Sequence, residues 1–407
     1  MALRLGILWF VLMAAFGCYY PYYSLYLKQV LGLSATQVGT VIAMQPLAGI
    51  FAQPLWGHFA DRTGSRRRAL ALAIAGFALG AYGISQASTY PQVLLATAAF
   101  ATCSTSLLSM ATAVSLAALP SGTHGFGRVR MFGTLGYLAA VVLFPWLAIH
   151  AAGTEGPRRL VLIFAATTLL AIPAALLVLR LPPVESLGLR AHPGDLRQLL
   201  GHRPVRRIVI FAFFSNLVMQ GPINLFPVLL ASRGGEVEDL RLAWILMLML
   251  EIPLVAFAGA TLQRLGPRGL LAMGILGEGV RWTATAFVPS LAGTIGLQVL
   301  HGLSAMGVLI GVPLYLELCV PARLRSTGQT LVAAVGLGLG SVASSALGGF
   351  LFDRIGSFAP FLACGLTALA LAALLYLFLP APSRPEEACE ESHTPLDEEV
   401  TPAPSAA

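Results

Sequence analysis

The sequence predicts an all-α membrane protein with twelve transmembrane helices arranged as two six-helix halves. Three observations support this fold class. Only 11% of the 407 residues are charged and 57% are hydrophobic, whereas soluble proteins carry about 25% charged residues. Twelve apolar stretches approach or exceed the roughly 20 residues that a helix needs to cross a bilayer. A connection containing glycine and arginine in the first half recurs at the equivalent place in the second half.

The apolar stretches form two groups of six, with a polar stretch between them. The first six spans are expected near 5–30, 36–60, 67–88, 91–119, 127–152 and 158–181. The second six are expected near 207–232, 239–264, 268–288, 290–319, 324–352 and 357–380. The chain is therefore divided into an N-terminal bundle over 1–181, a cytoplasmic linker over 182–206, a C-terminal bundle over 207–380 and a tail over 381–407. Because the tail is rich in Pro, Glu and Ser, it is predicted to be disordered and acidic.

Twelve spans place both chain ends on one side of the membrane, and the basic residues indicate which side. Of the 25 Lys and Arg residues, 18 fall on the side of the termini, six fall on the opposite side, and Arg281 lies within a span. Because cytoplasmic loops carry the excess of basic residues, both termini are expected in the cytoplasm. A multi-pass protein of the plasma (inner) membrane is therefore expected. The net charge of +7 reflects this orientation, and no nucleic-acid partner is expected.

The stretch GHFADRTGSRRR (57–68) joins the second and third predicted spans. Its residues Gly57, Gly64 and Arg66 recur as Gly259, Gly266 and Arg268 in GATLQRLGPR (259–268), at a constant offset of 202 residues. The pattern G-x-x-x-D-R-x-G-x-R-R resembles the signature of the major facilitator superfamily, a family of transporters with two six-helix halves. The resemblance implies a conformational gate on the cytoplasmic side, formed by Gly57, Asp61, Arg62, Gly64 and Arg66. A solvated basic loop that only fixes topology is the alternative interpretation.

Four segments narrow the resemblance to the branch of the lactose permease, the phenylpropionate permeases and the nucleoside–proton symporters. They are GCYYPYYSLYL, QPLWGHFADRTG, FGRVRMFGTLGY and LQVLHGL. On this resemblance, Arg130 is expected to contact the substrate and Tyr137 to stack on it. Glu251, Arg281 and His301 match charged and polar residues that the lactose permease buries in its eighth, ninth and tenth spans.

The departures from the lactose permease are equally informative. Its acid in span 4, which partners the substrate-binding arginine, aligns near Thr112, and span 4 here contains no acid. Its proton-carrying glutamate is replaced by Ser304 and the lysine of span 10 by Gln298. The aspartates of span 7 are absent as well. These differences argue against galactoside transport, fit the phenylpropionate-permease-like branch better and leave proton coupling to another carboxylate.

Charged residues deep in the spans are predicted to couple transport to protons. An ionised group at mid-bilayer costs about 2.5–3.5 kcal/mol, so such groups tend to be functional. Glu251 and Arg281 each lie fifteen residues from the turn at Gly266, reach the same depth and can pair. Glu278 lies three residues before Arg281 on the same helical face and is a second possible partner. His301 of span 10 completes the predicted group. A buried ion pair that only fastens two helices is the alternative.

Other polar and aromatic residues are predicted to line a substrate cavity. Spacing by four places Asn216, Gln220 and Asn224 on one face of span 7. Tyr19 and Tyr22 lie in the outer half of span 1 and can stack on an aromatic substrate. The alternatives are helix–helix hydrogen bonding for the span 7 residues and, for Arg130, an interfacial position in which the side chain snorkels.

These features predict a secondary transporter that couples a small organic solute to protons by alternating access. The sequence contains no Walker motif, so ATP is not the energy source, and no enzymatic activity, cofactor or metal is expected. Arg130 without an acid in span 4 favours an aromatic or other carboxylate as solute. The alternatives are a nucleoside or sugar–proton symporter, a drug–proton antiporter, and a transporter-like sensor or scaffold. The protein is expected to function as a monomer in the lipid bilayer.

Overall fold

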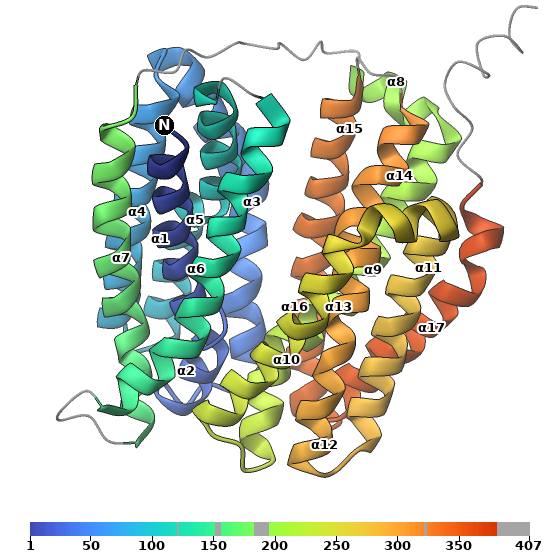
Figure 1. Cartoon of the computed structure of the whole chain (residues 1–407). Helices are drawn as coiled ribbons and strands as arrows, with labels where there is room; N and C mark the ends of the chain where they lie inside the picture. The colour runs from blue at the N-terminus through green and yellow to red at the C-terminus, as the bar shows by residue number, and fades with distance from the viewer. Residues whose placement is uncertain (120–121, 151–155, 183–194, 321–323, 381–407) are drawn as a thin grey trace, which may run out of the picture.

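The computed structural model describes residues 1–119, 122–150, 156–182, 195–320 and 324–380. These residues form helices and no strand. Ten helical stretches are long and apolar enough to cross a membrane. Helices α10 (Val237–Ala256) and α11 (Ala258–Phe287) stand among them (Figure 1) and bring the number to the twelve predicted. The predicted tail 381–407 and residues 183–194 of the predicted linker lie outside the described residues.

The helices of the first half follow one another in the order predicted. They are α1 (Ala2–Tyr19), α2 (Tyr23–Gln29), α3 (Ala35–Thr63), α4 (Arg66–Gln86), α5 (Tyr90–Ala118), α6 (Gly122–His150) and α7 (Leu162–Leu179). The first span is interrupted between α1 and α2, where Pro21 lies. A proline lacks a backbone N–H, so it disfavours a continuous helix. Helix α3 begins with a capping box, in which Ser34 and Gln37 satisfy each other's backbone amides.

The helices of the second half are more irregular. They are α8 (Asp195–Gly201), α9 (Arg203–Ser232), α10, α11, α12 (Leu291–Gly296), α13 (His301–Ser304), α14 (Gly311–Cys319), α15 (Arg325–Val332), α16 (Ser341–Arg354) and α17 (Ala359–Phe378). The tenth span contains a π-helical segment over Ala305–Ile310 and the eleventh another over Ala333–Gly340. Such π-helical turns occur frequently at functional sites, and the first directly follows α13.

The turns between the second and third helices of each half both contain a glycine with a positive φ. Gly64 ends α3 at φ +64° and ψ 9°, and Gly266 interrupts α11 at φ +67° and ψ 174°. Only glycine adopts such positive φ values readily. The glycines of the internal repeat therefore both stand at turns that need glycine, although the two turns differ in conformation. The predicted span 239–264 is wrong at its end: α10 stops at Ala256, and residues 258–265 form a separate helical arm before Gly266 (yellow in Figure 1).

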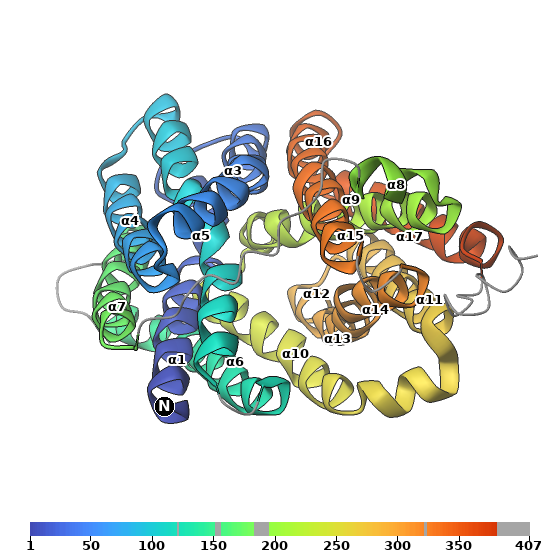
Figure 2. The ribbon, with the colours of Figure 1, turned by 90° about the horizontal axis from the view of Figure 1, so that it is seen from above.

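The two halves contact each other along α3 and α16, which face each other in Figure 2. A side chain on Gly39 would clash with the backbone oxygen of Ser345, so only glycine permits this approach. At the end of α3 opposite to the termini, the carboxylate of Asp353 accepts hydrogen bonds from the backbone N–H of Ala35 (3.1 Å) and of Thr36 (2.7 Å). Two further hydrogen bonds join the halves on this side, from Tyr20 to Asn224 and from Thr36 to the backbone oxygen of Gly349. The halves are thus joined on the side opposite to the termini.

Candidate substrate and coupling site

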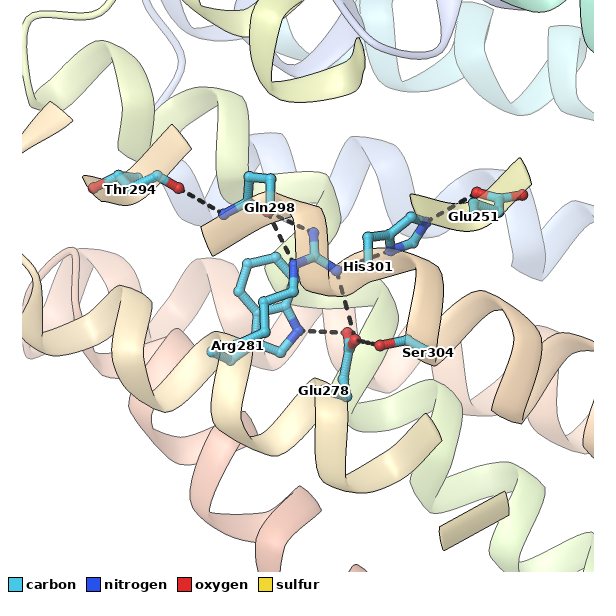
Figure 3. Close-up of polar contacts among 8 residues, drawn as sticks. Glu251, Glu278, Arg281, Thr294, Gln298, His301 and Ser304 are labelled. Carbon is cyan, nitrogen blue, oxygen red and sulfur yellow. Dashed lines mark hydrogen bonds and ion pairs between the residues drawn. The ribbon is translucent and has the colours of Figure 1, made fainter. Parts of the chain in front are cut away.

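A buried ion pair lies at the centre of the second half. Nη1 of Arg281 is 3.5 Å from Oε2 of Glu278, and both side chains are 0% exposed (Figure 3). Both residues belong to α11, three positions apart, which places them on one helical face. The guanidinium also lies 3.9 Å from the ring centroid of Trp282, where its charge meets the negative face of the aromatic ring.

Besides its ion pair with Arg281, the carboxylate of Glu278 accepts two hydrogen bonds. The indole N–H of Trp282 donates to Oε1 at 2.5 Å, and the hydroxyl of Ser304 donates to Oε2. An ionised carboxylate is an acceptor only, so two donors and a guanidinium fit the ionised form of Glu278. The position where the lactose permease carries a glutamate is here a serine, and this serine supports a different glutamate.

A neutral amide holds the other side of the guanidinium. Oε1 of Gln298 accepts from Nε of Arg281 at 3.0 Å and from Nη2 at 2.6 Å. The amide group is oriented in turn because its nitrogen donates to the backbone oxygen of Thr294 at 2.9 Å. The sequence marked Gln298 only as a departure from the lactose permease. Its role as an acceptor for two donors of Arg281 emerges from the structure.

His301 connects Arg281 to Glu251. Nη1 of Arg281 lies 2.9 Å from Nδ1 of His301, and Nε2 of the same ring lies 3.9 Å from Oε2 of Glu251. A guanidinium can only donate, so Nδ1 accepts and the proton of the neutral ring resides on Nε2, facing Glu251. The sequence offered Glu251 and Glu278 as possible partners of Arg281. In the structure Glu278 is the partner, and His301 lies between Arg281 and Glu251.

The four predicted coupling residues thus form one chain of polar contacts across three helices. They run from Glu278 and Arg281 on α11 through His301 on α13 to Glu251 on α10 (Figure 3). The side chain of Glu251 is 30% exposed, whereas the Glu278–Arg281 pair is fully enclosed. Within this chain, Glu251 is therefore the more accessible of the two carboxylates.

The first half contains a second arginine in a different environment. Arg130 of α6 lies with its guanidinium 4.8 Å from the ring centroid of Trp9. The indole N–H of Trp9 donates to the hydroxyl of Ser115 on α5 at 2.9 Å. Nη1 of Arg130 has no hydrogen-bond partner among the described residues. Since α5 contains no acid, the half-buried guanidinium rests on an aromatic ring and keeps a donor unused.

Aromatic rings from both halves meet between these two arginines. Tyr137 of α6 and Tyr20, which directly follows α1, each lie edge-on to Trp244 of α10, with centroids 6.4 and 6.3 Å away. The hydroxyl of Tyr20 donates to Oδ1 of Asn224 at 3.3 Å. The sequence predicted Tyr137 and Asn224 and missed Tyr20 and Trp244. The signal for Trp244 was its spacing of seven residues from Glu251, which places both on one helical face.

Of the other predicted substrate residues, Tyr19 lines a cavity between the halves, whereas Tyr22 and Asn216 form their hydrogen bonds within one half. Tyr19 lines a small cavity between the halves and accepts a hydrogen bond from Gln45 at 3.0 Å. Tyr22 is fully buried, and its hydroxyl donates to the backbone oxygen of Val141 in the first half. Asn216 donates to the backbone oxygen of Ala212 on its own helix, α9, which packs against the π-helical segment of the eleventh span. Gln220 is half-buried on the same helix between Asn216 and Asn224.

The predicted gate residues lie at the end of α3 that is on the side of the termini and at the start of α4. Asp61 and Arg62 are exposed, Arg66 is half-buried, and the backbone oxygen of Asp61 accepts from the N–H of Gly64 at 3.3 Å. Gly57 has open space around it. Ser65 begins α4 by accepting from the N–H of Arg68. The structure shows how Gly64 ends the helix and leaves the role of the gate a prediction. No group of three or more potential metal ligands occurs among the described residues.

A twelve-helix fold with polar residues buried between two halves defines a membrane transporter. Residues 2–363 match the MFS_1 like family, and the chain belongs to this family of transporters, which are not enzymes. It is 30% identical over 356 residues to the maltose permease of Geobacillus stearothermophilus, covering 85% of this chain and 86% of the relative. It is 21% identical over 344 residues to the putative nucleoside transporter YegT of Escherichia coli, covering 80% of this chain and 78% of YegT.

Solved structures share the same fold. The nucleoside transporter NupG superposes with a TM-score of 0.78 at 17% identity, covering 93% of this chain and 98% of the other. The D-xylose-proton symporter superposes with a TM-score of 0.71 at 17% identity, covering 94% and 97% of the two chains. The predicted fold class and family are confirmed.

Proposed function

We propose that the protein is a proton-coupled symporter of a small organic solute, in which Glu251 carries the proton. The observation that carries this proposal is the chain of contacts from Glu278 to Glu251. The pair of Glu278 and Arg281 is complete and enclosed, so it needs no proton. Glu251 is the accessible end of the chain, and it faces the Nε2–H of His301.

Protonation of Glu251 acts on the second half through His301. When Glu251 is ionised, it attracts the Nε2–H and so favours the ring orientation in which Nδ1 accepts from Arg281. When Glu251 is protonated, this electrostatic attraction is lost, and α10 is less tightly bound to α13. Because α10 also faces the first half through Trp244 and Tyr137, a proton on Glu251 biases the contact between the halves. A proton that binds the two conformations differently shifts their populations.

In this proposal, the solute binds between Arg130 of the first half and Arg281 of the second half. An aromatic or other carboxylate is the first candidate, because the unpartnered Nη1 of Arg130 offers a charge-assisted hydrogen bond to an anion. A sugar is the second candidate, favoured by the rings of Tyr137 and Trp244 and by the 30% identical maltose permease. Binding of 3-phenylpropionate, maltose and uridine to the purified protein, measured as thermal stabilisation, distinguishes the two candidates and the nucleoside alternative.

The coupling proposal is tested by Glu251→Gln in membrane vesicles. Glutamine imitates the protonated acid and cannot release a proton, so we expect exchange of the bound solute across the membrane to persist. Uphill accumulation driven by a pH gradient should be lost. Glu317→Gln is the matched control, because Glu317 lies at the exposed end of α14 beside Arg325. Accumulation by Glu251→Gln at the rate of the control would show that another group carries the proton.

A further inference from the structure

Trp244 lies where the two halves meet, on the same helix as Glu251. The two residues are seven positions apart on α10, which is about two helical turns and roughly 10 Å. The side chain of Trp244 is only 6% exposed. Tyr20 and Tyr137 of the first half approach its ring edge-on. Trp244 is therefore the residue of α10 that packs against the aromatic rings of the first half.

A small cavity between the halves adjoins Trp244. Its lining includes Tyr19, Gln45, Asn224 and Trp244, so both halves contribute polar atoms and aromatic surface. Asn224 bridges the halves here, since it accepts from Tyr20 and its amide nitrogen donates to the hydroxyl of Ser345. Any solute that passes between the halves on the outer side meets these groups.

The indole N–H of Trp244 is buried and has no hydrogen-bond acceptor among the described residues. The other indoles inside the protein are all satisfied: Trp9 donates to Ser115, Trp56 to the backbone oxygen of Thr102, and Trp282 to Glu278. A buried donor without an acceptor is costly and rare. Trp244 thus differs from its counterparts in having a donor left unused at the contact between the halves.

We propose that Trp244 is a solute-contacting residue of the second half. Its N–H donates to an oxygen of the solute, and its ring covers the apolar face of the solute opposite Tyr137. The inference rests on the proposed function in placing the solute between the halves. The solute class that fits is a molecule with a flat or ring-shaped apolar face and an oxygen acceptor at its edge. A planar carboxylate and a sugar ring both satisfy this description, whereas an aliphatic amine does not.

The contact would also link the solute to the proton site. Trp244 and Glu251 share one helical face, so a solute that enters between the rings of Trp244 and Tyr137 moves the helix that carries the proton-binding carboxylate. An indole N–H donates to neutral and to anionic oxygens alike in geometry, so Trp244 selects for shape and for an acceptor at the ring edge. Arg130 would then select for charge.

The first test is the binding of 3-phenylpropionate, maltose and uridine to the parent and to Trp244→Phe by isothermal titration calorimetry. Phenylalanine keeps an aromatic ring and removes the N–H. We expect the probe that binds the parent to bind Trp244→Phe at least tenfold more weakly. Trp146→Phe, on the exposed side of α6, is the matched control and should bind as the parent does. Equal affinity of Trp244→Phe and the parent overturns the proposal.

The second test needs no solute. Collisional quenching of tryptophan fluorescence is compared between the parent and Trp244→Phe in vesicles, with acrylamide in the water and with brominated lipid in the bilayer. The component that Trp244→Phe loses should be quenched by acrylamide more strongly than by brominated lipid. Stronger quenching by the lipid would place Trp244 against the bilayer and overturn the proposal. If none of the three solutes binds the parent, the solute classes proposed above are wrong, and this measurement still decides the position of Trp244.

Discussion

The two halves each enclose one arginine in the membrane, and they hold it in opposite ways. Arg281 of the second half has a carboxylate, an amide oxygen, a histidine nitrogen and an aromatic ring around it. Arg130 of the first half has the ring of Trp9 and an Nη1 without a described partner. The guanidinium of Arg281 is surrounded by acceptors from the protein, whereas Nη1 of Arg130 is left without a described acceptor and can donate to a bound solute.

The difference teaches how the two halves divide the work. Arg281 binds only groups of the protein, so its charge holds α11 against neighbouring helices. Through His301, this contact depends on the charge of Glu251. A charge held by an aromatic ring keeps its orientation without being neutralised, so it is available to an incoming anion. We infer that the first half selects the charge of the solute and that the second half couples its transport to the proton.

The largest expected effect is the loss of stability in Glu278→Gln. Removing one partner of a buried ion pair leaves the other charge unpaired, which costs about 3–5 kcal/mol. The melting temperature of the purified protein in detergent should fall by several degrees. Glu317→Gln, which removes an exposed carboxylate, should melt as the parent does. An unchanged melting temperature for Glu278→Gln would mean that Gln298 alone suffices for Arg281, and the contrast between the arginines would disappear.

Arg130→Lys should show the reverse pattern, with weaker binding and normal stability. Lysine keeps the charge and loses the planar fork that binds a carboxylate through two donors. We expect affinity for an anionic solute to fall by a factor of ten or more, about 1.4 kcal/mol. The melting temperature without solute should stay close to that of the parent, because Arg130 has no ion pair to lose among the described residues. Unchanged solute affinity would assign Arg130 to the interfacial class of snorkelling side chains.

A smaller effect is expected at the repeated connections on the cytoplasmic side. Asp61 has Gln263 as its counterpart at the offset of 202 residues, so only the first half carries an acid there. If this acid helps to close the cytoplasmic side in the opposite state of the transport cycle, Asp61→Asn should slow transport several-fold and leave the amount of protein in the membrane unchanged. Thr63→Ser in the same connection is the matched control. If Asp61→Asn transports at the parental rate, the segment 57–68 determines only the orientation of the chain in the membrane and is not a gate.

The sequence predicted the local and periodic features of the molecule well. Most span lengths and the repeat at Gly64 and Gly266 follow from counting residues along helices. Which groups pair could not be obtained in this way. His301 lies between Glu251 and Arg281 because α13 inserts its side chain there, and that depends on how three helices are rotated. Contacts between the halves are harder still, since they join residues hundreds of positions apart.

Asp353 is such a contact, and it gives the smallest and most specific prediction. The segments 61–64 and 353–356 both read D-R-x-G. Asp61 is exposed on the side of the termini, whereas Asp353 caps α3 on the opposite side, where the two halves are in contact. A carboxylate at a helix N-terminus contributes about 0.3–1 kcal/mol.

Asp353→Asn keeps one acceptor oxygen and removes the charge, so outer closure should weaken by less than the effects above. Loss of about 0.3–1 kcal/mol corresponds to a shift of roughly two- to fivefold toward the state that is open on the outer side. The readout is labelling of Ser345→Cys, at the contact of α16 with α3, by a maleimide that does not cross the membrane. Labelling should be faster with Asp353→Asn than with the parental aspartate. Equal rates would show that the glycine contacts of α3 and α16 close the outer side alone, and that the two halves do not use their D-R-x-G segments in parallel ways.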